Sequence, residues 1–124
     1  MKSLTDYLDN IDPEQPDEDV VFAFRKEFLS RYKSLEKTFD LHRPEDPELI
    51  DLYIDTGLVI DHTNLMAGSV LNGSFRKHSY EVVSGMLPGI ESKISRLAKD
   101  TSQRNQRYAT IARTITEEYG LNNP

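Results

Sequence analysis

Residues 18–41 read EDVVFAFRKEFLSRYKSLEKTFDL, and this stretch decides the fold class. Its apolar side chains recur every three or four residues, which is the spacing of one face of an α-helix. The members of this face are Val21, Phe24, Phe28, Tyr32, Leu35 and Phe39. Lys and Arg side chains occupy the opposite face, and Asp17 is a good N-cap residue. The pattern predicts a helix from Glu18 to Leu41 whose aromatic face belongs to the core.

A short helix is predicted before this one. Ser3 can cap it, with Asp6 three residues later, and it would end near Asn10. Pro13 and Pro16 exclude a regular helix across the residues that follow. We therefore expect residues 1–16 to form a short N-terminal helix and a Pro-containing linker.

A third helix is predicted to begin at Pro47, because Asp46 can cap it and proline fits the first helical position. Apolar residues cover most of its circumference, which favours a central and most buried place in the fold. It continues to about Leu71, or it breaks near residues 63–64. The pair at positions 72–73, Asn followed by Gly, predicts its end.

Two more helices are expected after that turn. Ser74 can cap a fourth helix that ends near Ser84, because Gly85 and the Pro88-Gly89 pair predict a break. The last helix would start near Ile90 and extend to about residue 119. Its apolar residues keep the same helical register throughout, which favours one helix of roughly thirty residues over two.

Together these elements predict an all-α single domain over residues 1–124, a bundle of four to five helices with a long C-terminal helix. The chain contains no cysteine, so thiolate zinc sites, disulfides and cysteine nucleophiles are excluded. No apolar run approaches the ~20 residues of a membrane span. We expect a cytoplasmic protein with no membrane contact.

Charge is distributed unevenly along this acidic chain, whose net charge is −6. Residues 1–19 and 40–61 are strongly acidic, whereas residues 74–113 are basic. One interpretation is that acidic and basic helices neutralise one another inside the bundle. The other is a two-faced surface that steers a charged partner.

One helix face carries residues that could hold a metal ion. Glu48, Asp51, Asp55 and His62 share this face of the third predicted helix. The simpler interpretation is a solvated acidic face, since bundle metal sites draw ligands from several helices. No phosphate-binding or nucleophile motif occurs. The expectation is therefore no enzyme, no cofactor and no metal.

The basic C-terminal half supplies the predicted partner-binding residues, which are Arg96, Lys99, Arg104, Arg107, Tyr108, Ile111 and Ile115. The last predicted helix carries an apolar seam, which consists of Ile94, Leu97, Tyr108, Ile111 and Ile115. Residues 99–107 interrupt this seam with polar side chains. The helix could project into solvent there, could break there, or could present Arg104 and Arg107 to an acidic partner or nucleic acid.

These patterns favour a non-catalytic protein–protein interaction module, such as an adaptor, inhibitor, chaperone or assembly factor. The alternative is a helical nucleic-acid-binding regulator that uses the basic half, with Tyr108 stacking on a base. A third hypothesis is a metal-dependent enzyme on the acidic face. The seam of the last helix also predicts a homodimer, unless the N-terminal helix folds back and covers it.

Overall fold

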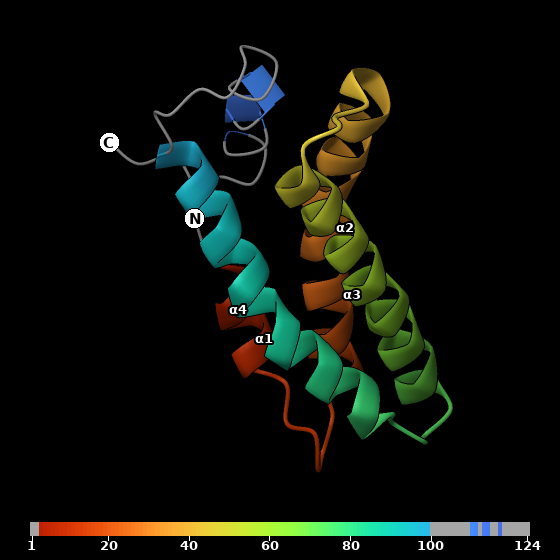
Figure 1. The fold of residues 1–124 in the computed structure, drawn as a ribbon. Helices are drawn as coiled ribbons and strands as arrows, with labels where there is room; N and C mark the ends of the chain where they lie inside the picture. Colours follow the sequence, from red (N-terminus) through yellow and green to blue (C-terminus); the bar gives the residue numbers. More distant parts are fainter. Residues whose placement is uncertain (1–2, 100–109, 112, 115–116, 118–124) are drawn as a thin grey trace.

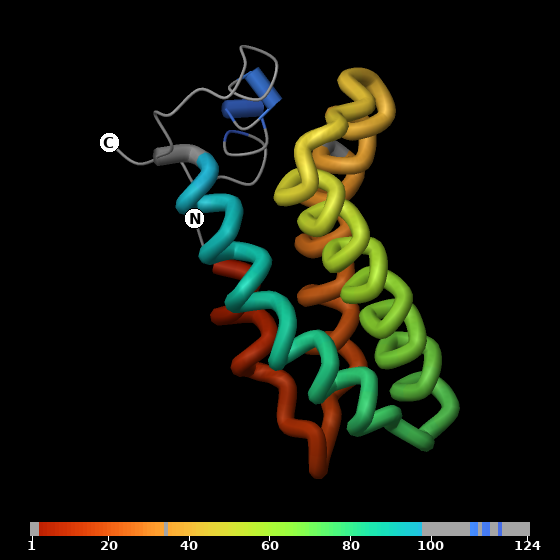
Figure 2. Tube along the Cα trace, in the orientation of Figure 1, coloured from red at the N-terminus to blue at the C-terminus, as the bar shows by residue number. Residues whose placement is uncertain are grey.

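The computed structural model describes residues 3–99, 110, 111, 113, 114 and 117. Within them the chain forms four α-helices and no strand. The helices are α1 (Leu4–Asp9), α2 (Glu18–His42), α3 (Pro47–Leu71) and α4 (Lys77–Lys99) (Figure 1). The long helices α2, α3 and α4 run alternately up and down, and α1 lies beside α4 (Figure 2). The predicted all-α bundle is confirmed.

Three helix starts occur where the capping residues predict them. The Ser3 side chain accepts a hydrogen bond from the backbone N–H of Asp6, and the Asp17 side chain accepts one from Asp19. Asp46 accepts from the N–H of Glu48, with Pro47 at the first helical position. Each cap satisfies a backbone donor that the helix itself leaves unpaired.

Both connections between the long helices turn through a left-handed residue. Arg43 ends α2 with a φ of 43°, and Gly73 follows α3 with a φ of 70°. The backbone N–H of Ser74 donates to the carbonyl oxygen of Ser69, and the backbone N–H of Arg76 donates to the Ser69 hydroxyl. These bonds close a tight turn, so α4 starts at Lys77. The predicted start at Ser74 is wrong, because Ser69 already holds this segment in the turn.

The predicted break between Ser84 and Ile90 is also wrong, because α4 continues through Gly85, Pro88 and Gly89. The two glycines and the proline lie on the exposed side of the helix. Its other side carries an uninterrupted buried row, which consists of Val83, Leu87, Ile90, Ile94 and Leu97. Burial of this row against the bundle outweighs the local cost of the proline.

The described residues beyond α4 are Thr110, Ile111, Arg113, Thr114 and Glu117, and all are helical. They lie at the end of the bundle where α4 ends (Figure 1). The polar segment 100–109 lies outside the described residues. The prediction that residues 90–119 form one helix therefore stays a prediction.

The core consists of the aromatic face of α2, the inner face of α3 and the apolar row of α4. The phase predicted for α2 is confirmed, since Phe24 and Phe28 are fully buried and Tyr32 stacks on Phe28 at 6.4 Å. Helix α1 and the segment after it cover one side of this core. Leu4, Leu8 and Ile11 are buried there, with α1 in contact with both α2 and α4.

Helix α3 contacts both α2 and α4, as a central helix should. Of the three long helices it also contains the most buried residues among those described, as expected for the central helix. Five of its large apolar residues are nevertheless exposed, because neighbours cover only part of its circumference. These residues are Ile50, Ile54, Leu58, Leu65 and Leu71.

Candidate interaction surface

Four of the exposed apolar residues of α3 form a single line along the helix. Ile50, Ile54, Leu58 and Leu65 are 39%, 59%, 44% and 42% exposed. Their spacings of four, four and seven residues place them on one face. We call these four residues the α3 stripe. At the helical rise it extends about 22 Å.

Contacts on both flanks fix the orientation of α3 and direct the stripe outward. On the α2 side, the rings of Phe39 and Tyr53 lie 4.9 Å apart, and Arg25 Nε donates to the Asn64 side-chain oxygen at 2.9 Å. On the α4 side, His62 Nδ1 lies 3.1 Å from the hydroxyl of buried Ser79. The α3 stripe lies between these flanks and faces away from the core.

Carboxylates accompany the stripe, and α3 contains no Lys or Arg. Asp61 lies within it, between Leu58 and Leu65, and is exposed. Asp51 and Asp55 follow along its α4 side. None of these three carboxylates forms an ion pair within the described part of the chain.

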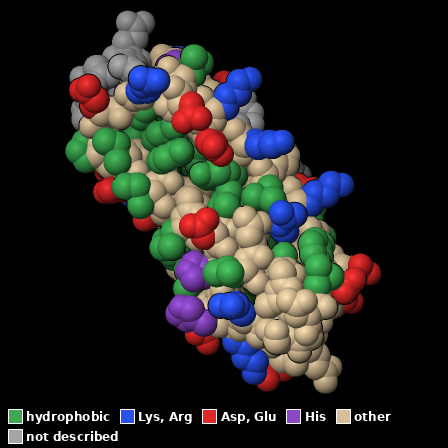
Figure 3. All heavy atoms as spheres, turned by 90° about the vertical axis from the view of Figure 1, so that its right-hand side faces the viewer, with side chains coloured by type: hydrophobic (Ala, Val, Ile, Leu, Met, Phe, Trp, Pro, Cys, Tyr) green, Lys and Arg blue, Asp and Glu red, His purple; other side chains and the backbone are tan. Residues whose placement is uncertain are grey.

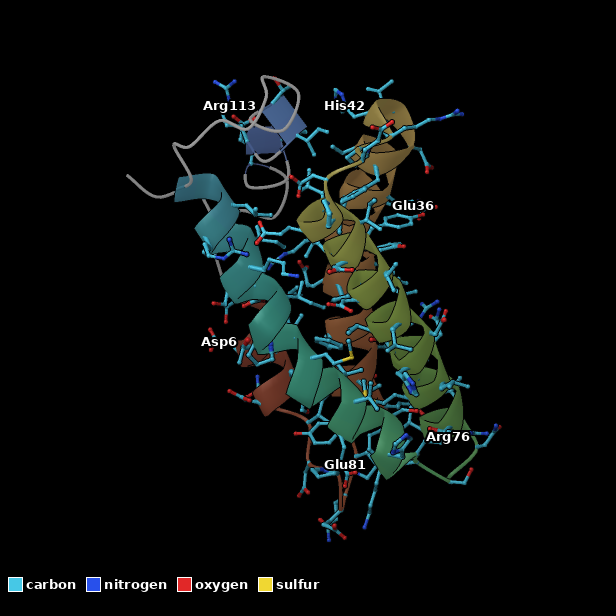
Figure 4. The ribbon with its side chains drawn as sticks, in the orientation of Figure 1. Asp6, Glu36, His42, Arg76, Glu81 and Arg113 are labelled. Carbon is cyan, nitrogen blue, oxygen red and sulfur yellow. The ribbon has the colours of Figure 1, made fainter. Side chains whose placement is uncertain are left out.

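The α2 side of the stripe is acidic as well. Burial, together with the nearby carboxylates of Glu36, Asp61 and Asp40, raises the pKa of the Tyr32 hydroxyl to about 12. Figure 4 shows Glu36 at the outer edge of the α2–α3 pair, away from α4. Figure 3 shows hydrophobic side chains gathered on this face with acidic ones among them, whereas Lys and Arg follow mainly one edge.

The predicted partner-binding residues are only partly described. Arg96 is ion-paired with Glu48, Lys99 is the last residue of α4, and Ile111 is fully buried. Arg104, Arg107, Tyr108 and Ile115 lie outside the described residues. This site therefore stays a prediction, although Ile111 is already covered in a single chain.

The seam proposed for a homodimer is covered where the structure describes it. Ile94, Leu97 and Ile111 are buried within this chain. Helix α1 packs against α4, with Thr5 Oγ1 donating to Glu91 at 3.4 Å. This contact agrees with the alternative to a homodimer, in which the N-terminal helix folds back against the C-terminal seam.

The residues of the candidate metal-binding face do not come together as a metal site within the described part of the chain. Glu48 pairs with Arg96, and His62 pairs with Ser79. Among the described residues, no group of three or more His, Asp or Glu side chains is arranged to hold a metal ion. The rings of His62 and His78 do approach each other, with centroids 5.8 Å apart.

The α3 stripe is the feature that sequence reasoning missed, although a signal for it was present. Helix α3 carries more large apolar residues than one buried face can hold. Leu49, Leu52, Val59 and Met66 fill the inner face, and the stripe repeats the four-residue spacing beside them. A second apolar row of this kind on one helix indicates a second contact surface.

Comparison with known proteins gives no relative. No family model, no curated protein and no solved structure matches the chain. Of the described helices, none has both the length and the hydrophobicity that crossing a bilayer requires.

Proposed function

We propose that this chain is a non-catalytic protein-binding module, an adaptor, inhibitor, chaperone or assembly factor, whose contact surface is the α3 stripe. One observation carries the proposal, which is the exposure of four aligned large apolar residues on a helix packed against α2 and α4. Singly scattered apolar residues are common on protein surfaces, but aligned ones mark interaction sites.

Energetics favour a partner over solvent. Full burial of one Leu or Ile side chain is worth roughly 1.5–3 kcal/mol. The stripe is about half covered already, so a partner would gain only part of that for each residue. Because α3 is held by α2 and α4, little ordering cost would offset the gain.

The basic half offers less support for a nucleic-acid regulator. Lys77 pairs with Glu14 at 2.8 Å, and Arg96 pairs with Glu48 at 2.9 Å. Both pairs join the basic half to acidic segments, as expected if the charges neutralise within the bundle. Arg104 and Arg107, on which the regulator hypothesis depends, lie outside the described residues. A cytoplasmic location belongs to the proposal and rests on the sequence alone.

The proposal is tested by capture from the native host followed by quantitative mass spectrometry. Ile54→Asp combined with Leu58→Asp should release proteins that the unaltered chain captures. Leu71→Asp is the matched control, since Leu71 is as exposed as Ile54, at 59%, but lies off the stripe. Identical capture by the double variant and the unaltered chain, with both folded by circular dichroism, would exclude the stripe as the binding surface.

A further inference from the structure

We infer that the partner of the α3 stripe is a basic amphipathic helix, with an apolar seam against the stripe and Lys or Arg side chains against Asp51, Asp55 and Asp61. The inference rests on the proposed function, in which the stripe binds protein. It adds the chemistry of the partner.

The shape of the surface selects a helix. The stripe is a row at four-residue spacing, and such rows pack into the grooves of a second helix. The backbone groups of α3 are already bonded within the helix, so an extended strand would gain no ladder of hydrogen bonds. A partner must therefore contribute side chains at helical spacing, over about four turns.

The charge of the surface selects a basic partner. Among the residues that the structure describes, Glu48 is the only one of the four acids on α3 with a cationic partner in an ion pair, Arg96. Asp61 lies inside the stripe, so any partner that covers Leu58 and Leu65 also removes water from this carboxylate. Covering a carboxylate without a cation is costly, whereas a Lys or Arg that meets it offsets the loss.

A second copy of the chain fits this surface poorly. Two stripes placed face to face would bring together two sets of α3 carboxylates with no Lys or Arg from either helix. Like charges across a contact suppress binding. Glu36 and Asp40, which act on Tyr32 together with Asp61, add to the same repulsion.

The test uses two synthetic helical peptides with the same Leu and Ile seam, one with Lys and the other with Glu at every flanking position. Binding to the full chain is measured by fluorescence anisotropy. The Lys peptide should bind at least tenfold more tightly than the Glu peptide. Asp55→Lys combined with Asp61→Lys should reverse that preference.

The matched control is Asp9→Lys combined with Glu81→Lys, which changes the net charge equally at exposed positions on α1 and α4. It should retain the preference for the Lys peptide. Ile54→Asp combined with Leu58→Asp should abolish binding of that peptide, which separates docking on the stripe from general attraction to an acidic protein.

Each contrary result has a distinct meaning. Equal binding of both peptides that the stripe variant abolishes would leave the proposed function standing and overturn the basic partner. Peptide binding that Ile54→Asp combined with Leu58→Asp leaves unchanged would overturn both the inference and the proposed function. A dimer of the chain alone, dissociated by Ile54→Asp in analytical ultracentrifugation, would identify a second copy as the occupant and overturn the inference. Failure of the Lys peptide to bind would overturn it as well.

Discussion

The carboxylate of Glu48 on α3 and the guanidinium of Arg96 on α4 form an ion pair, with 2.9 Å between Oε1 and Nη2. In the sequence, Glu48 belongs to a candidate metal-binding face and Arg96 to a candidate partner surface. In this structure the two residues pair with each other. Both side chains remain partly exposed, so the pair contributes only about 0.2–1 kcal/mol.

Phe28→Ala should lower the free energy of unfolding by about 3–5 kcal/mol, because it removes a fully buried ring between Phe24 and Tyr32. Urea denaturation followed by circular dichroism measures the loss. Leu41→Ala is the control, since Leu41 is 74% exposed and its truncation should change stability by about 0.5 kcal/mol or less. Equal effects of the two variants would show that Phe28 does not belong to the core.

Thr63→Val should leave stability unchanged or raise it by about 1 kcal/mol. The Thr63 hydroxyl is fully buried and has no hydrogen-bond partner among the described residues. Thr56→Val is the matched variant on the same helix, because the buried Thr56 hydroxyl donates to the Leu52 carbonyl at 2.6 Å. The melting temperature of Thr63→Val should therefore exceed that of Thr56→Val. The reverse order would contradict a Thr63 hydroxyl without a hydrogen-bond partner.

Gly85→Ala and Gly89→Ala should each raise the free energy of unfolding by about 0.5–1 kcal/mol, because alanine restricts the unfolded chain and suits a helix. A Cβ at either position would meet nothing within 4 Å. Gly73→Ala should do the opposite, since a φ of 70° strains any side chain. Destabilisation by the first two variants would indicate that α4 is not continuous there.

Glu91→Gln should become more stable relative to the unaltered chain as pH rises from acidic to neutral. Burial raises the pKa of the Glu91 carboxyl above its ordinary value of 4.5, although nearby Arg31 and the hydrogen bond from Thr5 oppose the shift. The folded chain then binds this proton more tightly than the unfolded chain does. The contribution of Glu91 to stability therefore falls as pH rises from 4.5 through the raised pKa, and the glutamine variant should lack this fall.

Urea titrations from about pH 4 to about pH 8 measure the difference between the two profiles. Thr5→Val should have the opposite effect, because loss of its hydrogen bond should raise the pKa of Glu91 further. The loss of stability with rising pH should then be larger than in the unaltered chain. Parallel profiles for the unaltered chain and Glu91→Gln would show that the carboxyl is not buried as described.

The sequence by itself predicts the helical class and most helix bounds. Caps at Ser3, Asp17 and Asp46 act through hydrogen bonds to residues two or three positions away. The aromatic face of α2 follows from a repeat that one helix contains completely. Such features are local, so no knowledge of the rest of the fold is needed to read them.

Features that depend on neighbouring helices cannot be read from a local pattern and emerge from the packed fold. Pro88 reads as a helix break, yet burial of the row that includes Leu87 and Ile90 keeps α4 continuous. Helix α3 is apolar almost all round, so its sequence does not reveal which side is covered. The positions of α2 and α4 settle that question, and they leave the α3 stripe exposed because two neighbouring helices cover only part of a cylinder.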